Sequence, residues 1–166
     1  MGHVERSFEE LVSSRYDVLR RSAFVLCGDH GHAEDLVQNV LAKAYRSWSR
    51  LQSVDDLDAY LHVALVNASR TWWRRRWHGE RTSGSVTDSV AQDATGDVDL
   101  RLALVGALGQ LGAAHREVLA LRFLAGLSET ETATRLGIAS GTVKSRVSRA
   151  LAELRAKGAL RDEVIS

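Results

Sequence analysis

The chain has 166 residues, enough for one ordinary domain or two small ones, and its 45% apolar and 26% charged content is typical of a folded protein. The net charge of only +1 hides an uneven distribution, because basic segments at 70–77 and 144–157 flank an acidic one at 79–99. This pattern suggests two contacts with one polyanion. A single cysteine, Cys27, fits a reducing cytoplasm, and neither a signal peptide nor a membrane-spanning apolar run is present. We therefore expect a cytoplasmic protein with no membrane partner.

The chain contains no proline and shows no strand-like alternation, so the predicted fold class is all-α. The first helix is expected to begin at Ser7, where Glu10, three residues further on, completes a capping box. Apolar residues then recur at helical spacing as far as Ala23, and Gly28 and Gly31 mark a turn.

Two further amphipathic helices follow this turn. One carries an apolar stripe from Ala33 to Trp48, and the next runs from Leu57 to Trp72 and ends in three arginines, which suit a helix C-terminus. Together the three helices predict a small bundle in a first domain, residues 1–78. Periodicity disappears over residues 79–98, which we expect to form a flexible acidic linker. It resumes in a second helical domain, residues 99–166.

The strongest local signal is a helix-turn-helix at residues 126–155. Ser128 and Glu131 form a capping box, Ala133 is small where two helices cross, and Gly137 can adopt the positive φ of a tight turn. Ser140 is expected to cap the second helix. The outer face of that helix carries donors suited to phosphates and base edges, namely Thr142, Lys144, Ser145, Arg146, Ser148 and Arg149. Basic residues alone would also fit a solvated helix, but their combination with the capping box and turn glycine favours DNA binding.

These motifs resemble region 4 of the extracytoplasmic-function (ECF, group IV) sigma factors of the sigma-70 family, through Arg116–Arg122, Gly126–Ser128 and Gly141–Arg146. The first domain resembles region 2 of the same family through Ala33–Gln38 and Ala59–Arg76, and residues 66–77 are similar to an actinobacterial, sigma-E-like subgroup. The resemblance covers about 7–78 and 99–157. It implies a non-enzymatic transcription initiation factor without a cofactor, in which region 2 binds the −10 promoter element and region 4 the −35 element.

The resemblance also implies core RNA polymerase as a partner, through its β′ clamp helices and β flap, beside promoter DNA. It allows an anti-sigma factor as a further partner. On the second helix, polar residues lie opposite the apolar stripe, on a face that could dock against a coiled coil. We expect Asp35, Gln38 and Asn39 on this face to contact the polymerase.

By the same resemblance, region 2 opens the −10 element. The loop from Ser53 to Asp56 and the start of the third helix are expected to form a pocket for an unstacked base. Tyr60 and Leu61 occupy the place of an aromatic wedge. The candidate base readers are His62 and Asn67, and the candidate phosphate ligands are Arg70, Arg74, Arg75 and Arg76.

The sequence departs from the family pattern at several positions. Gly112 replaces a usual proline, and Val66 and Thr71 replace common polar residues on the third helix. Thr132 replaces an apolar residue inside the helix-turn-helix, which predicts a less stable domain.

Other residue groups admit more than one interpretation. Trp72 continues the apolar stripe and is expected in the core, whereas Trp73 and Trp77 either cover the domain or flank the DNA backbone. Cys27, His30 and His32 lack an obvious fourth ligand, so no metal site is predicted, and no catalytic motif supports an enzyme. Two alternatives stay open. One is an autonomous helix-turn-helix regulator, disfavoured by the lack of a dimer helix, and the other is a helical adaptor with no nucleic-acid role.

Overall fold

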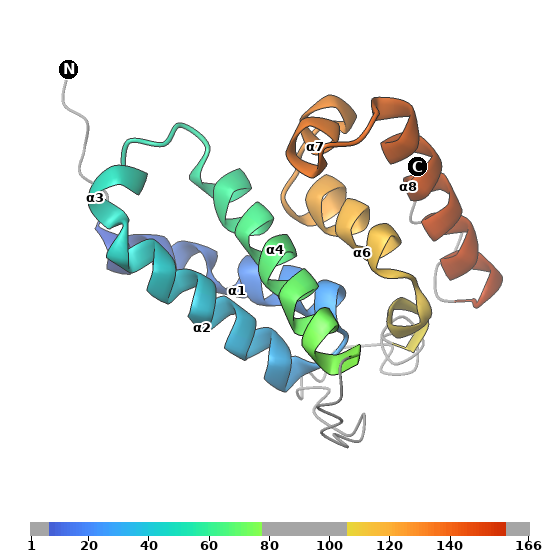
Figure 1. The fold of residues 1–166 in the computed structure, drawn as a ribbon, viewed down its shortest axis with the longest axis horizontal. Coiled ribbons are helices and arrows are strands. Elements are labelled where there is room, and N and C mark those ends of the chain that lie inside the picture. Colours follow the sequence, from blue (N-terminus) through green and yellow to red (C-terminus); the bar gives the residue numbers. More distant parts are fainter. Residues whose placement is uncertain (1–6, 78–105, 159–166) are drawn as a thin grey trace.

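The computed structural model describes residues 7–77 and 106–158, and every regular element within them is helical (Figure 1). The expected linker, residues 79–98, and the expected domain limits at 78 and 99 lie outside the described residues. The all-α class is confirmed. In chain order the elements are α1 (Phe8–Cys27), α2 (His30–Arg46), α3 (Trp48–Leu51), α4 (Leu57–Trp77), α6 (Ala113–Leu119), the π-helix η1 (Ala120–Leu124), α7 (Glu129–Leu136) and α8 (Ser140–Ala156).

The predicted start of α1 is confirmed, because the Ser7 hydroxyl accepts a hydrogen bond from the Glu10 amide at 3.2 Å. Gly28 ends the helix with φ of 76°, a left-handed conformation that glycine adopts without steric cost. Asp29 then caps α2, accepting bonds from the amides of Gly31 at 2.7 Å and His32 at 3.2 Å. Gly31, expected in the turn, therefore lies inside the first turn of α2.

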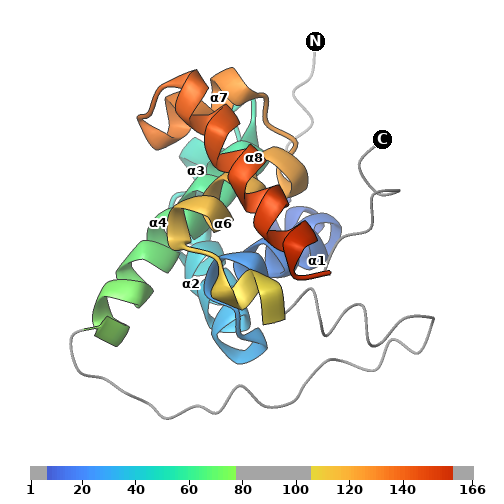
Figure 2. The same ribbon diagram turned by 90° about the vertical axis from the view of Figure 1, so that its right-hand side faces the viewer.

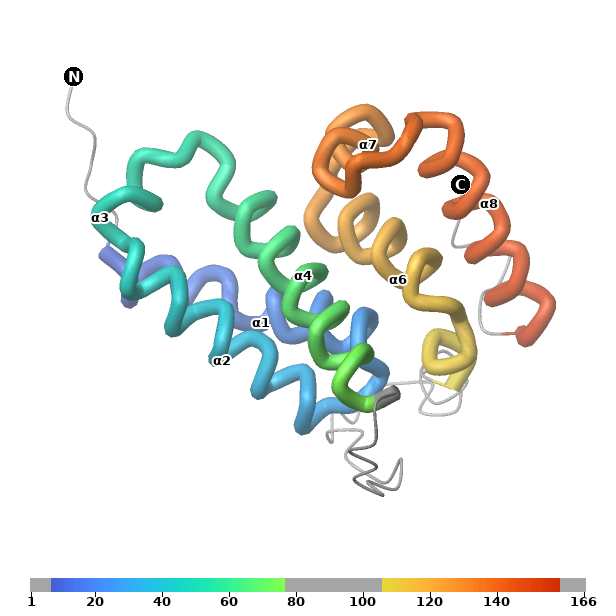
Figure 3. Tube along the Cα trace, viewed as in Figure 1, coloured from blue at the N-terminus to red at the C-terminus, as the bar shows by residue number. Residues whose placement is uncertain are grey.

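Helices α1, α2 and α4 pack against one another as an N-terminal bundle, visible along the Cα trace in Figure 3. Their apolar stripes meet in one core, in which Leu19, Leu61 and Leu65 are at most 1% exposed. Burying a leucine side chain of this kind stabilises a fold by about 1.5–3 kcal/mol. The stripes read from the sequence are thus the faces that pack.

The predicted helix-turn-helix is formed by α7 and α8. Ser128 and Glu131 make both bonds of the capping box, at 3.0 and 3.1 Å, and Gly137 turns the chain with φ of 68°. Ala133 is buried together with Val118 and Val143 in a small core of its own. The prediction for Ser140 is wrong. Ala139 occupies the N-cap position of α8 and no side chain caps that helix.

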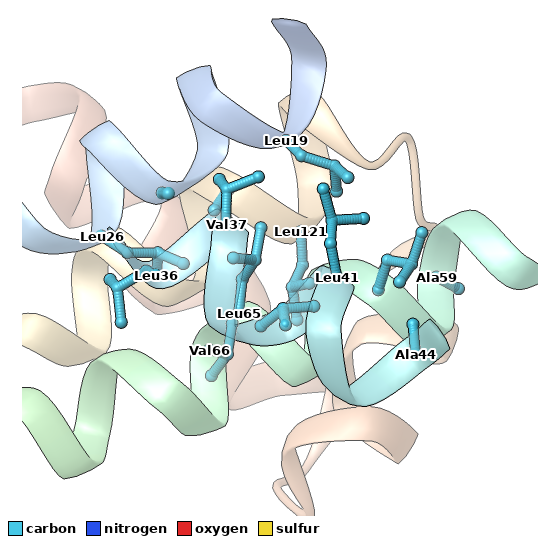
Figure 4. Packing of buried hydrophobic residues seen from close by; sticks show 14 of the residues in the cluster. Leu19, Leu26, Leu36, Val37, Leu41, Ala44, Ala59, Leu65, Val66 and Leu121 are labelled. Atoms are coloured by element: carbon cyan, nitrogen blue, oxygen red, sulfur yellow. The ribbon is translucent and has the colours of Figure 1, made fainter. Parts of the chain in front are cut away.

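The C-terminal helices also pack onto the N-terminal bundle. The π-helix η1 contacts both α1 and α4, and Figure 2 shows the C-terminal helices against the bundle from a second side. Leu121 of η1 is fully buried and belongs to the core cluster of the bundle, where Figure 4 shows it near Leu41 and Leu65. Among the helices of residues 7–77 and 106–158, none has the length and hydropathy needed to cross a membrane.

Candidate functional surfaces

The outer face of α2 presents the three candidate polymerase contacts. Asp35, Gln38 and Asn39 are all exposed, while Leu36 and Val37 between them are buried in the bundle core. The three polar side chains follow the helical period, so they share one face. This face is free to meet a partner helix.

A cavity of about 240 Å³ lies between this face and α4. Asn39 lines it from α2, and Tyr60 and Asn67 line it from α4. The structure therefore brings a candidate polymerase contact beside two candidate DNA contacts. Lys43 and Thr71 line the same cavity and were not among the predicted residues, although Lys43 lies one helical turn after Asn39 and could have been placed on this face from the sequence.

The loop before α4 is exposed from Ser53 to Asp56, as a DNA-contacting loop must be. Asp56 also caps α4, its carboxylate accepting a bond from the Ala59 amide at 3.0 Å. A second cavity of about 510 Å³ separates this loop from α1. An ion pair between Arg15 and Asp58, at 2.9 Å, lies on its wall.

Leu61 and His62 are placed differently from the prediction. Leu61 is 0% exposed and His62 is 3% exposed, so neither side chain can contact DNA in this structure, which contradicts their assignment as wedge and reader. The His62 ring is held by a contact of 2.8 Å between Nδ1 and the Asp58 carbonyl oxygen. Burial lowers the pKa of His62, which favours the neutral imidazole.

The end of α4 combines exposed arginines with packed tryptophans. Arg74, Arg75 and Arg76 are exposed, and the Arg76 guanidinium lies over the rings of Trp72 and Trp73 at 5.2 and 5.7 Å. The two half-buried tryptophans meet edge to face at 4.6 Å, and the Trp73 indole donates to the Leu26 carbonyl at 3.1 Å. Both tryptophans therefore have packing roles.

Arg70 has a partner that the sequence did not reveal. Its Nε and Nη2 atoms donate to the two carboxylate oxygens of Glu117 on α6 at 2.8 and 2.9 Å. These bonds raise the pKa of Arg70. The preceding residue of α6, Arg116, lies over the Trp73 ring at 4.5 Å. No sequence signal marks either contact, because helical periodicity does not show which side chains of one region meet those of the other.

The outer face of α8 carries the candidate contacts of the helix-turn-helix. Lys144, Ser145, Ser148 and Arg149 are exposed, whereas Thr142 and Arg146 are half-buried. The exposed donors suit phosphate oxygens and the acceptor-rich edge of guanine. Four of the six predicted residues are thus fully available, and the other two are available in part.

Comparison with known proteins identifies the family of the chain. Residues 11–79 match the family model for sigma-70 region 2, and residues 107–156 match the model for sigma-70 region 4. The RNA polymerase sigma-E factor of Streptomyces coelicolor is 40% identical over 162 residues, which cover 98% of this chain and 91% of the relative. The chain belongs to the extracytoplasmic-function sigma factors of the sigma-70 family.

Other ECF sigma factors are similar over most of their length. The ECF RNA polymerase sigma factor SigL of Mycobacterium tuberculosis is 34% identical, with 87% of each chain covered. The solved structure of the sigma factor RpoE from Bartonella quintana, in complex with the anti-sigma factor NepR, has a TM-score of 0.72 at 32% identity, covering 90% of this chain and 95% of that one. The structure of CnrH with the cytosolic domain of CnrY has a TM-score of 0.60 at 26% identity, covering 90% and 85%.

Family membership gives the surfaces their general meaning. This ECF sigma factor is a non-catalytic subunit that directs RNA polymerase to promoters through regions 2 and 4, and the helix-turn-helix of region 4 binds DNA. The N-terminal bundle is region 2, and helices α6 to α8 lie in region 4.

Cys27 and the two neighbouring histidines lie at the turn between α1 and α2. The Cys27 thiol is buried and contacts the Asp29 carbonyl at 3.3 Å, and burial raises its pKa to about 11. His32 pairs with the Asp29 carboxylate at 3.1 Å. Within the described residues, no group of three or more His, Cys, Asp or Glu side chains is arranged to hold a metal ion.

Proposed function

We propose that this sigma factor binds the β′ clamp helices of core polymerase through Asp35, Gln38 and Asn39 and recognises the −10 element with the adjoining face of α4. The observation that carries the proposal is the cavity between α2 and α4, since Asn39 lines it together with Tyr60 and Asn67. A residue proposed to bind polymerase and two residues proposed to bind DNA therefore line the same cavity. This arrangement fits a protein that binds polymerase and promoter DNA at the same time.

The base pocket predicted at the Ser53–Asp56 loop and the start of α4 stays part of the proposal, and we extend it to this cavity, whose chemistry also fits an unstacked base. Extracting a base from the duplex costs a few kcal/mol, and stacking on an aromatic ring returns about 1–3 kcal/mol per base. The Tyr60 ring is 39% exposed at the cavity and can supply that stacking. Asn67 supplies an amide for base edges, and Arg74 to Arg76 supply charge for the phosphates.

In region 4, the exposed face of α8 is proposed to contact the −35 element through the six predicted residues from Thr142 to Arg149. The β flap of polymerase is proposed as a second partner of region 4.

The proposed location is the cytoplasm, where polymerase acts. The proposed domain limits are residues 1–78 for region 2, 79–98 for the linker and 99–166 for region 4. The solved structures of Bartonella RpoE and of CnrH are complexes with NepR and with the cytosolic domain of CnrY, respectively. By analogy, we propose that an anti-sigma factor also binds the present chain.

Reconstitution with core polymerase tests the proposal. Replacing Asp35 and Gln38 together by alanine should weaken core binding about tenfold or more, because contact residues at the centre of an interface each cost upwards of 1 kcal/mol. Circular dichroism should stay unchanged, since both side chains are exposed. The matched control replaces Asp17 and Gln52, which are also exposed but lie on α1 and after α3.

Membership of the sigma-70 family decides against the two alternatives, an autonomous helix-turn-helix regulator and a helical adaptor with no nucleic-acid role. The reconstitution therefore tests the assignment of residues within a sigma factor. If the Asp35 and Gln38 double variant binds core polymerase with normal affinity, the outer face of α2 is not the polymerase-binding surface.

A further inference from the structure

The cavity between α2 and α4 presents one charged side chain to its occupant. Figure 1 shows the two helices side by side, and Lys43 of α2 lines the cavity together with Asn67 and Thr71 of α4. Lys43 is exposed, and within the described residues it makes no ion pair. The volume of about 240 Å³ is below the roughly 300–1,000 Å³ of pockets for drug-sized ligands, so the cavity suits a single base.

The other polar groups of the cavity do not select between donors and acceptors. The side-chain amides of Asn39 and Asn67 can each donate and accept, and so can the hydroxyl of Tyr60. The Thr71 hydroxyl donates to the Asn67 carbonyl oxygen at 3.3 Å, but it can rotate away from that bond. An ammonium group can only donate. Lys43 therefore fixes the hydrogen-bonding polarity of the cavity.

No carboxylate opposes this polarity. The described residues that line the cavity include neither an aspartate nor a glutamate. The cavity between α1 and the loop before α4 is the reverse case, because its lining contains one arginine and four carboxylates, those of Glu10, Asp55, Asp56 and Asp58. The two cavities thus favour ligands of opposite hydrogen-bonding character.

We propose that Lys43 makes the cavity between α2 and α4 selective for a keto base, guanine or thymine, at one position of the −10 element. The inference rests on the proposed function of α4 and names the kind of base that its cavity takes. Guanine carries the acceptor O6 and thymine the acceptor O4 where adenine and cytosine carry the amino groups N6 and N4. A lysine donor that faces an amino donor leaves both groups without a partner, which costs affinity.

The test uses holoenzyme reconstituted from the full chain and core polymerase. It transcribes a promoter library randomised over the −35 and −10 windows, and sequencing of the transcripts gives the base preference at every position. Two variants change the proposed contact. In Lys43→Glu the new carboxylate can accept from an amino group, and Lys43→Met removes both the donor and the charge.

The matched control is Arg46→Glu. Arg46 is exposed, lies three residues after Lys43 on α2 and does not line the cavity, and its substitution makes the same charge change as Lys43→Glu. Circular dichroism checks that each variant is folded. Because both lysine variants and the control replace exposed residues, the helical signal should stay unchanged.

The wild-type holoenzyme should prefer guanine or thymine at one position of the −10 window by about fivefold or more, the lower end of what a good base contact gives. Lys43→Met should abolish most of this preference, and Lys43→Glu should reverse it in favour of cytosine or adenine. Every other position should keep its preference. Arg46→Glu should leave the preference at all positions unchanged, whatever its effect on the total amount of transcript.

Three results would overturn the proposal. An equal loss of transcript from all −10 sequences in both Lys43 variants would mean that Lys43 binds a phosphate, which carries no base information. Wild-type transcription and preferences in both variants would mean that Lys43 contacts neither base nor backbone. A wild-type preference for cytosine or adenine at the position that responds to Lys43→Met would contradict the polarity assigned to the cavity.

Asn67→Ala separates failure of this inference from failure of the proposed function. If Asn67→Ala changes a base preference in the −10 window and the Lys43 variants do not, the inference about Lys43 fails and the assignment of α4 stands. If none of these variants changes any −10 preference, the proposed function of α4 fails and the inference falls with it.

Discussion

At the scale of single residues, the least satisfied side chain of the helix-turn-helix is Thr132. It is fully buried, as its place in the sequence predicted, and its hydroxyl has no hydrogen-bond partner. A buried hydroxyl without a partner loses its bonds to water and gains none in return. The domain therefore folds despite this residue.

Replacing Thr132 by valine should stabilise the protein, because a methyl group takes the place of the unsatisfied hydroxyl. We expect a rise of about 1 kcal/mol in the free energy of unfolding, measured by urea denaturation. The control is Thr134→Val, since Thr134 is exposed and should change stability by less than about 0.5 kcal/mol. A loss of stability on Thr132→Val would mean that the hydroxyl has a partner in solution.

Residue placement could be predicted where the helical period decides it. The period alone puts Leu61 in the core, beside Leu57 and Leu65, and the structure agrees. The resemblance to sigma factors instead made Leu61 a wedge for DNA, and burial contradicts that role. The pairing of Arg70 with Glu117 could not be predicted from helical periodicity. A charged residue on a helix is expected to face solvent unless its partner is known.

At the scale of elements, the long helices could be predicted and the short ones could not. Capping residues and glycines locate the ends of α1 and α7 because each supplies a bond or a backbone angle that a helix end needs. The four residues of α3 and the five of η1 span too few turns to show a period. The N-cap of α8 was predicted at Ser140, one residue too late. Ala139 already has the extended backbone conformation of an N-cap.

The exposed face of α8 leads to a prediction for Arg149. Its replacement by alanine should reduce promoter-dependent transcription about tenfold where −35 recognition limits initiation, since a bidentate base contact is worth about 1–3 kcal/mol. Core binding should be unchanged. Arg155→Ala is the matched control, because Arg155 is an exposed arginine in the last turn of the same helix. If the Arg149 variant transcribes every cognate promoter at the wild-type level, Arg149 does not contribute to −35 recognition.

At the scale of the whole molecule, the order of the two helical regions could be predicted but their packing could not. Apolar periods locate the regions, and the patternless stretch between them carries no information on how they meet. The contact joins Arg70 of α4 to a later segment, α6 and η1, which carries Arg116, Glu117 and Leu121. The two segments are far apart in the sequence. Only the three-dimensional arrangement shows that one α6 carboxylate faces one α4 guanidinium.

The linker leads to the last prediction, which concerns how two weak DNA contacts become one strong one. When polymerase holds region 2, region 4 reaches the −35 element at an effective concentration set by the length of the linker. The proposed linker, residues 79–98, lies outside the described residues, so the prediction rests on its sequence alone. Roughly doubling it with flexible Gly and Ser residues after Gly96 adds about 0.6 kcal/mol of closure entropy.

Transcription from promoters that need both elements should therefore fall about threefold at limiting sigma factor, while core affinity stays the same. A linker of natural length with the same composition in scrambled order is the control, and it should transcribe normally because only length enters the entropy. Transcription and core affinity are measured on the same preparations. An equal loss of both would show that the insertion damages region 2. No loss of either would show that region 4 reaches the promoter independently of the linker.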